Sequence, residues 1–154
     1  MLTVLPLEEA RSLVLDAFAR DEAMPVELVP LEKACGRICA QDVISQEGVP
    51  AFDRSTVDGF AVHARNTFGC SEAIPALLDL GLEVHMGQYP DFPCVVDQCN
   101  RISTGGMLPE GADAVVMLEY VEDYGDGTIG IMKPVSPGDN VAFRYDDCAP
   151  NAVL

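Results

Sequence analysis

Basic residues are scarce in this chain. Among its 154 residues, nine Lys and Arg stand against 25 Asp and Glu, which gives a formal net charge of −16 at pH 7. A surface with this excess of acid repels both nucleic-acid phosphates and anionic lipid headgroups. We therefore expect neither a nucleic acid nor a membrane as a partner.

Long apolar runs are also missing, most clearly near the N-terminus. Residues 1–9 lack the basic start and the sustained apolar stretch of a signal peptide. Glu8, Asp16 and Asp21 interrupt any segment that could cross a bilayer. These absences favour a cytoplasmic location.

Cysteine patterns typical of zinc sites are lacking as well. Neither Cys35 with Cys39 nor Cys94 with Cys99 has CxxC spacing, and the two histidines are distant in sequence from both pairs. Six cysteines would permit three disulfides, but a chain of this size with 49% apolar residues can form a core without such cross-links. We therefore predict reduced cysteines and no metal site within this chain.

Helical patterns are confined to the first 45 residues. Residues 7–20 predict an amphipathic helix, because apolar side chains recur there at the spacing of one helical face, namely Leu7, Ala10, Val14, Ala17 and Phe18. A second, short helix is predicted from Pro30 to Gly36, after an extended piece at residues 26–29. Residues 37–45 alternate between apolar and polar side chains and predict a strand.

The sequence changes in character after Gly48, where prolines separate short apolar runs. This pattern is typical of short strands and turns. Strands are predicted over residues 59–63, 77–84, 95–102, 114–118, 128–132 and 140–144. Gly125 and Gly127 predict a hairpin connection over residues 119–128. The fold class is therefore mainly β with N-terminal helices, an α+β arrangement of short strands.

One segment with polar side chains of chemical interest is Pro50-Ala-Phe-Asp-Arg-Ser-Thr-Val-Asp-Gly-Phe-Ala-Val62. Ser55 and Asp58 have the spacing of a capping box, in which a hydroxyl and a carboxylate accept hydrogen bonds from free amides at a helix start. The spacing by itself favours that interpretation. The alternative is a loop where Asp53, Ser55 and Asp58 gather as acceptors for a substrate and Gly59 permits close backbone approach.

A second segment contains Thr104-Gly105-Gly106 at the end of a predicted strand. Free backbone amides and one hydroxyl at such a place can bind an oxyanion. Paired glycines also occur simply where a chain turns, so this short motif indicates little by itself.

Three long stretches together resemble a known family, the molybdopterin molybdenumtransferases, which include the corresponding domain of gephyrin. The stretches are Val29-Pro-Leu-Glu-Lys-Ala-Cys-Gly-Arg-Ile-Cys-Ala-Gln-Asp-Val43, the Pro50 to Val62 segment, and Arg101-Ile-Ser-Thr-Gly-Gly-Met-Leu-Pro-Glu-Gly-Ala-Asp-Ala-Val-Val116. They follow in the family's order and cover nearly the whole chain.

The resemblance implies a domain organisation. Residues 1–45 would form a helical dimerisation region completed by residues 141–154, with a β-rich second domain inserted at residues 46–140. Family members continue into a larger α/β catalytic domain, which is missing from these 154 residues. The resemblance also implies a homodimer in which the second domain of one subunit closes over the catalytic cleft of the other.

The resemblance further implies a reaction and a site. Family members insert molybdate into adenylated molybdopterin with loss of AMP, and they use Mg²⁺, which we expect to bind tightly only in a full-length enzyme. Asp58 and Thr104 match positions that contribute to catalysis in the family. Substrate binding is expected from Asp53, Ser55, Gly59, Gly105 and Arg144.

The return to the first region departs from the family pattern. Family members have an asparagine, an apolar residue and three arginines followed by Gly-Glu-Asp, whereas this chain has Asn140-Val-Ala-Phe-Arg144-Tyr-Asp-Asp147. Ala142 and Phe143 thus replace two arginines, which are natural partners of phosphate or carboxylate. This loss raises an alternative, a catalytically divergent binding or assembly module. A stand-alone metal or oxyanion sensor is less favoured, because the sequence has no ligand cluster.

Overall fold

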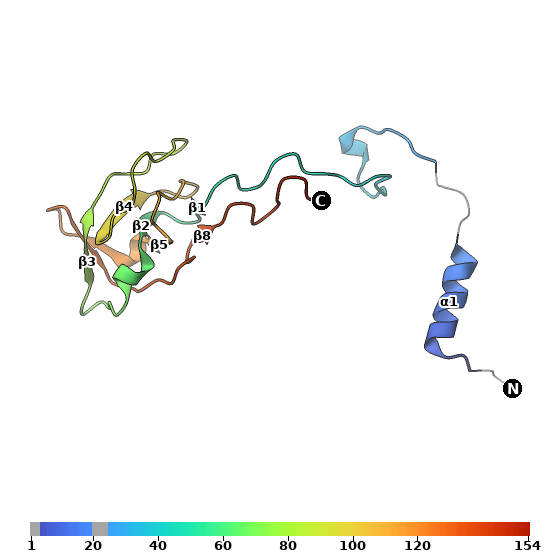
Figure 1. The fold of residues 1–154 in the computed structure, drawn as a ribbon, viewed down its shortest axis with the longest axis horizontal. Coiled ribbons are helices and arrows are strands. Elements are labelled where there is room, and N and C mark those ends of the chain that lie inside the picture. The colour runs from blue at the N-terminus through green and yellow to red at the C-terminus, as the bar shows by residue number, and fades with distance from the viewer. Residues whose placement is uncertain (1–3, 20–24) are drawn as a thin grey trace. The chain divides into compact units, whose positions relative to one another are not determined.

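The computed structural model describes residues 4–19 and 25–154, which divide into two compact units, Met1–Gln41 and Asp42–Leu154. The first contains the helix α1 (Leu7–Phe18), and the second contains every strand (Figure 1). Sequence analysis thus predicted the class correctly, a mainly β chain with N-terminal helical structure.

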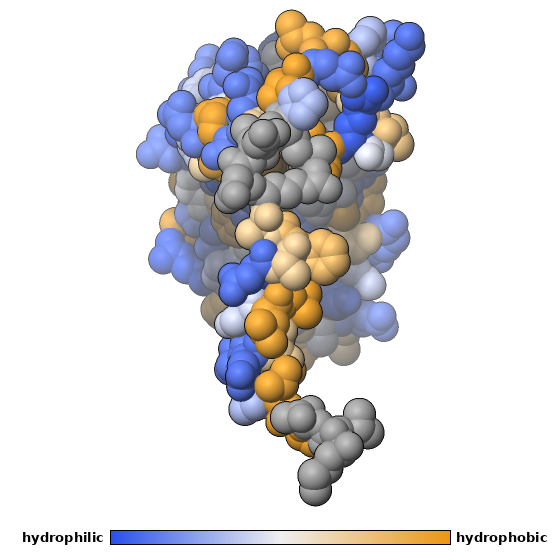
Figure 2. All heavy atoms as spheres, turned by 90° about the vertical axis from the view of Figure 1, so that its right-hand side faces the viewer, coloured by the Kyte–Doolittle hydropathy of each residue, from blue (hydrophilic) through white to orange (hydrophobic). Residues whose placement is uncertain are grey.

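Helix α1 confirms the predicted amphipathic segment, and Arg20 lies outside the described residues. Glu8 and Glu9 occupy its first turn, where negative charge interacts favourably with the helix dipole. No side chain of α1 is buried within the described residues, so its apolar face is open in this single chain. Figure 2 shows apolar and charged side chains on different sides of the extended N-terminal part.

The second predicted helix is much shorter than expected. Only one 3₁₀ turn forms, η1 (Leu31–Lys33), after Pro30 in an extended conformation. The strand predicted at residues 37–45 is also wrong, because that segment contributes one isolated bridge, from Ile44 to Val153. Alternation over a few residues cannot indicate whether a partner strand is available, and pairing is what makes a strand.

A six-stranded sheet forms most of the second unit, in the order β5-β2-β4-β3-β7-β6. Its strands are β2 (Gly59–Val62), β3 (Ala76–Leu80), β4 (Gln98–Ile102), β5 (Ala114–Met117), β6 (Val121–Asp123) and β7 (Thr128–Ile131). Strands β3 and β4 run parallel, and the other neighbours run antiparallel. The sheet curls into a half-barrel (Figure 1). Two 3₁₀ turns, η2 (Ala64–Thr67) and η3 (Leu118–Tyr120), connect its strands.

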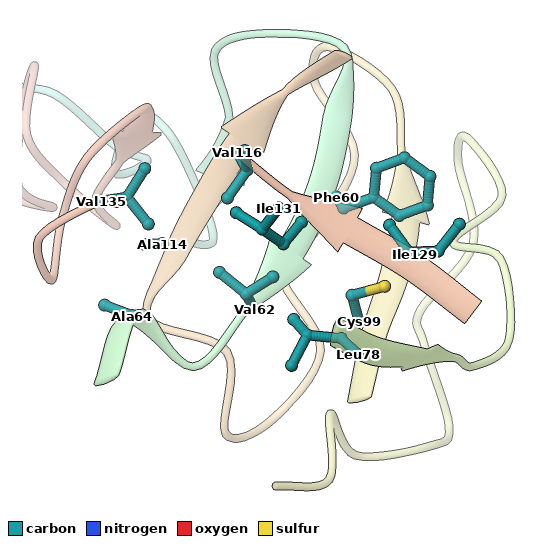
Figure 3. Packing of buried hydrophobic residues seen from close by; sticks show 10 residues of the cluster. All are labelled: Phe60, Val62, Ala64, Leu78, Cys99, Ala114, Val116, Ile129, Ile131 and Val135. Carbon is teal, nitrogen blue, oxygen red and sulfur yellow. The ribbon is translucent and has the colours of Figure 1, made fainter. Parts of the chain in front are cut away.

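The core lies within the curl of this sheet. Figure 3 shows its side chains converging from several strands, and they are Phe60, Val62, Ala64, Leu78, Cys99, Ala114, Val116, Ile129, Ile131 and Val135. A second cluster, Ala61, Val84, Ile102 and Val115, covers the opposite face of the central strands. Strand β2 is therefore buried on both faces, which explains why its sequence is apolar without alternation.

The predicted strands differ from the observed ones mainly at their ends. Strands predicted at residues 59–63, 114–118 and 128–132 are confirmed to within one residue, while those at 77–84 and 95–102 are shorter. Asp97 has φ of +63°, which ends the extended run before β4. The hairpin connection is shorter than residues 119–128, because this range also includes η3 and β6.

A separate two-stranded sheet joins β1 (Arg54–Ser55) to β8 (Val141–Ala142). Sequence analysis missed β1, and it predicted β8 as the longer run 140–144. Asn140 and Tyr145, with φ of +60° and +68°, limit β8 on either side. The strand is thus short because left-handed residues interrupt the extended backbone.

The chain enters and leaves the sheets along one path, which we name the connector (residues 43–53 and 143–154). Its two segments run antiparallel, with main-chain hydrogen bonds from Ser45 to Ala152 and from Val49 to Cys148, at 2.9 and 2.8 Å. Leu154 closes the pairing by donating to the Val43 carbonyl at 2.9 Å.

A bilayer-spanning helix needs about 20 apolar residues, and no helix in the described part of the chain meets that requirement.

Candidate functional site

The two segments singled out in the sequence meet through main-chain hydrogen bonds. Ser55 donates its N–H to the Gly106 carbonyl at 2.9 Å, and Gly105 donates to the Ser55 carbonyl at 2.8 Å. Leu108 donates to the Asp53 carbonyl at 3.0 Å. Residues that are about 50 positions apart in the sequence therefore form one loop pair, which we name the acidic loop pair (residues 53–58 and 103–108).

Asp58 and Thr104 form the polar contact at the surface of this loop pair. Asp58 Oδ1 accepts hydrogen bonds from the Thr104 N–H at 2.7 Å and from the Thr104 hydroxyl at 3.0 Å. The main-chain N–H bond, the hydroxyl and the charge of Arg101 lower the pKa of Asp58 below its ordinary value, against a small opposing effect of burial. Asp58 is therefore ionised throughout the neutral range, with its second oxygen free of intramolecular partners among the described residues.

The capping-box interpretation of Ser55 and Asp58 is wrong. No helix begins here, because β2 follows Asp58 directly. Ser55 is 1% exposed, and its hydroxyl donates to the Val57 carbonyl at 2.6 Å in a local turn. Asp58 instead contacts Thr104, a partner 46 residues away that no local pattern could identify. Ser55 therefore shapes the loop while Asp58 faces outward.

Each glycine of the site has a structural role. A Cβ on Gly59 would collide with the Val116 carbonyl oxygen, so Gly59 allows β2 to approach β5. Gly105 has φ of +85°, a conformation that favours glycine. Its N–H is occupied by the Ser55 carbonyl, and the Gly106 N–H is occupied by the Ser103 carbonyl. The free amides expected for an oxyanion are thus engaged within the loop, and the parts of Gly59 and Gly105 in substrate binding stay predictions.

Asp53 links this loop pair to Arg144. Its Oδ1 accepts the main-chain N–H of Arg144 at 2.7 Å. The Arg144 guanidinium does not turn toward that carboxylate. It lies over the ring of Tyr145, with 4.4 Å from Cζ to the ring centroid, and donates to the Tyr145 hydroxyl. The structure therefore brings the predicted site residues Asp53 and Arg144 together through the backbone.

Three residues that sequence analysis did not select belong to this region. Arg101, on β4, contributes positive charge near Asp58. Asn140 joins the return strand to the sheet, because its Nδ2 donates to the Val115 carbonyl at 2.8 Å and its own carbonyl accepts the Thr56 N–H. Tyr145 holds the Arg144 side chain. The departure from the family pattern at residues 140–147 was the one signal that pointed to the last two.

The donor set does not fit a resident Mg²⁺. Among the described residues, no three His, Cys, Asp or Glu side chains gather as a metal site. Mg²⁺ requires about six oxygen ligands in near-octahedral geometry, usually with substrate phosphates and water. Asp58 offers one unoccupied carboxylate oxygen, and Oδ1 of Asp53 is already engaged. Any Mg²⁺ used by a larger assembly needs its principal ligands elsewhere.

Comparison with known proteins places this fold in a defined class. The family described as MoeA N-terminal region (domain I and II) matches residues 5–154. The chain therefore belongs to this family, and its fold is that of the MoeA N-terminal portion.

Particular relatives support the same assignment. The chain is 34% identical to molybdopterin molybdenumtransferase of Bacillus subtilis over 155 residues, covering 99% of this chain and 35% of that protein. It is also 34% identical to a putative molybdopterin biosynthesis protein of Methanocaldococcus jannaschii, covering 98% of this chain and 36% of that protein. The chain thus spans about a third of the length of these curated relatives.

Solved structures agree in fold. The crystal structure of the molybdopterin biosynthesis moeA protein of Pyrococcus horikoshii OT3 superimposes with a TM-score of 0.75 at 36% identity, covering 99% of this chain and 39% of that one. A second structure of the Pyrococcus protein gives a TM-score of 0.69 at 43% identity, covering 98% of this chain and 38% of that one. The prediction of the family from three sequence stretches is confirmed.

Proposed function

We propose that this chain is the N-terminal portion of a molybdopterin molybdenumtransferase, acting in the cytoplasm in molybdenum cofactor biosynthesis. In this proposal it dimerises, and its sheet unit closes over the catalytic cleft of the partner subunit, where molybdate enters adenylated molybdopterin and AMP leaves. The observation that carries the proposal is the outward-facing contact of Asp58 with Thr104, which joins the two family stretches at one exposed point.

The chemistry of this point is that of an acceptor site. The Thr104 hydroxyl donates its hydrogen to Asp58, so the lone pairs of the hydroxyl oxygen remain available. Asp58 adds an ionised oxygen beside them. Such a pair binds N–H groups or ordered water and repels phosphate, so we assign it to the N–H edge of the pterin. Asp53, Ser55, Gly59 and Gly105 keep its loops in place, and we assign the anionic part of the substrate to Arg144.

The domain organisation completes the proposal. We propose residues 1–45 with 141–154 as the dimerisation region and residues 46–140 as the inserted domain. The exposed apolar face of α1 supports this division, because Leu7 and Phe18 are each 80% exposed and Val14 is 57% exposed. A helix with such a face gains stability when a second copy covers it.

Light scattering tests the dimer directly. Val14→Glu places a charge on the apolar face of α1 and is expected to lower the dimer fraction. Ser12→Glu introduces the same charge on the opposite side of the helix and serves as the matched control. A strict monomer of the unchanged chain at high concentration, or equal behaviour of the two variants, would contradict a dimer formed through α1.

A chimera tests the catalytic part. Residues 1–154 would replace the matching region of the Bacillus subtilis relative, in a strain lacking its own transferase, with activity of a molybdenum-dependent enzyme as the readout. We expect the chimera to restore activity and Asp58→Asn to lower cofactor yield about tenfold or more, because an ionised acceptor is lost. Asn preserves an acceptor for Thr104, so the variant should still fold and form the dimer, although with somewhat lower stability. Full yield in Asp58→Asn would refute the assignment.

The second candidate is a catalytically divergent binding or assembly module. It is favoured by Ala142 and Phe143, which occupy two of the three arginine positions in the family pattern. In this case the chimera would fold and dimerise but would restore no activity. Reintroducing Ala142→Arg with Phe143→Arg distinguishes the two, because recovery of activity would attribute the loss to these positions.

A further inference from the structure

Tyr145 has a backbone conformation that side chains rarely adopt. Its φ is +68°, in the left-handed region that favours glycine. A large aromatic residue in this conformation is uncommon. A strained residue that persists needs contacts that hold it, and these contacts indicate what the residue does.

The surroundings fix the Tyr145 ring on the connector. Its N–H donates to the Pro50 carbonyl at 2.9 Å. A Cβ on Gly48 would collide with the ring, so the ring lies directly on the Gly48 backbone. Tyr145 is half-buried, with Cδ1 and Cε1 of its ring next to Gly48. The other contact it makes is with the Arg144 guanidinium.

Arg144 is held on the ring and remains accessible. Its guanidinium lies 4.4 Å over the ring centroid and donates to the Tyr145 hydroxyl, while its main-chain N–H is fixed on Asp53. Arginine has five N–H donors, and the hydrogen bond found for this guanidinium among the described residues is the one to the Tyr145 hydroxyl, while Arg144 as a whole is exposed. The ion pairs found among the described residues are Arg11 with Glu8 and Arg37 with Glu27, and neither involves Arg144.

Nearby carboxylates would neutralise a mobile arginine at this place. Asp53 Oδ1 is occupied by the Arg144 N–H, and Asp146 Oδ2 accepts the Phe143 N–H at 3.0 Å. Asp147 follows directly in the sequence. Stacked on Tyr145, the guanidinium forms no ion pair with these acids among the described residues, in a chain whose net charge is −16. A fixed, unpaired guanidinium suits the planar pair of oxygens that a phosphate presents.

We propose that Tyr145 is a positioning residue that holds the Arg144 guanidinium ready to bind a phosphate group. This inference deepens the proposed function and rests on its assignment of Arg144 to the anionic part of the substrate.

Phosphate binding to the 154-residue chain tests the inference. Inorganic phosphate and AMP would be titrated while the Arg144 Nε–Hε signal is followed by NMR. We expect both probes to shift the signal, and Arg144→Gln to abolish binding. We expect Tyr145→Leu to weaken binding about two- to fivefold, the range of one exposed cation–π contact, and Tyr145→Phe to retain most of the affinity through its ring.

The Tyr145→Gly variant distinguishes a role of Tyr145 in positioning Arg144 from a role in stabilising the fold alone. Glycine relieves the left-handed strain, so the stability of the chain should be kept or increased, while phosphate affinity falls as in Tyr145→Leu. A phosphate affinity that is equal in the unchanged chain, Tyr145→Gly and Tyr145→Leu would overturn the inference. The absence of any phosphate-dependent shift at Arg144 would overturn it as well.

The chimera keeps this failure distinct from failure of the proposed function. Tyr145→Gly should raise KM for adenylated molybdopterin while kcat changes little, whereas Asp58→Asn should lower cofactor yield. If the chimera is active and its KM is the same with Tyr145 and with Tyr145→Gly, the positioning role of Tyr145 is refuted and the proposed function stands. If the chimera is inactive but phosphate affinity still depends on Tyr145, the proposed function is refuted and the positioning role stands.

Discussion

The carboxylate of Asp58 accepts both the main-chain N–H and the hydroxyl of Thr104, at 2.7 and 3.0 Å. These bonds stabilise the ionised carboxylate and lower its pKa. Because the folded pKa lies below the ordinary value of 3.8, the resulting stability is fully present above that pH and is lost as pH falls through the folded pKa.

The first prediction concerns this pH dependence. The unchanged chain should exceed Asp58→Asn in urea midpoint at pH 7, and the difference should shrink as the pH falls below 3.8 and through the folded pKa of Asp58, where both chains come to carry a neutral group. Urea unfolding at pH 7 and at a series of lower pH values measures it. A difference that stays constant across this range would mean that the charge of Asp58 contributes no stability.

The second prediction concerns Gly59. Gly59→Ala should destabilise the chain by about 1–3 kcal/mol, because the new methyl group would collide with the Val116 carbonyl in the neighbouring strand. Gly125→Ala gives a comparison in which no atom lies near the new methyl group, so its cost comes from a φ of +75°, a strain that Gly59 does not have. It measures backbone strain alone. A chain that tolerates Gly59→Ala without loss would show that β2 and β5 can separate.

The third prediction compares two neighbours on β3. Leu78 is 2% exposed and packs in the core, whereas Leu77 is 62% exposed. Leu78→Ala should lower the free energy of unfolding by about 2–5 kcal/mol, and Leu77→Ala by roughly 0.5 kcal/mol or less. Denaturant unfolding of both variants gives the comparison. A large effect at Leu77 would indicate that another surface covers it in solution.

The fourth prediction concerns thiol reactivity. Burial raises the pKa of Cys94 to about 11 and that of Cys99 to about 12, whereas Cys35 and Cys39 are exposed. A thiol reagent near neutral pH should therefore modify Cys35 and Cys39 first, and the buried pair only on unfolding. Peptide mapping of a time course measures this order, with the exposed cysteines as internal control. Equal rates at all four positions would contradict the buried arrangement.

Local sequence patterns predicted the parts of this fold that depend on local physics. The spacing of Leu7, Val14 and Phe18 predicted α1, and the central strands β2, β5 and β7 came close because apolar runs between turn residues are buried wherever they pair. The errors arose where a segment becomes a strand only by pairing with a residue that is distant in the sequence. Residues 37–45 alternate but find one bridge, and β1 exists because β8 returns to it.

The site shows the same division. Family stretches selected Asp58 and Thr104, but local spacing favoured a cap, because nothing near Asp58 in the sequence reveals a partner 46 residues away. Tyr145 escaped notice for a related reason. Its backbone conformation is set by the connector and by Gly48, which lies about a hundred residues earlier in the chain.

The paired ends of the connector have a consequence for protein engineering. Because Leu154 donates to the Val43 carbonyl, the chain arrives and departs side by side. The two ends of residues 43–154 therefore lie next to each other, so we expect that this segment can be inserted as a cassette into a loop of another protein with little change to that loop.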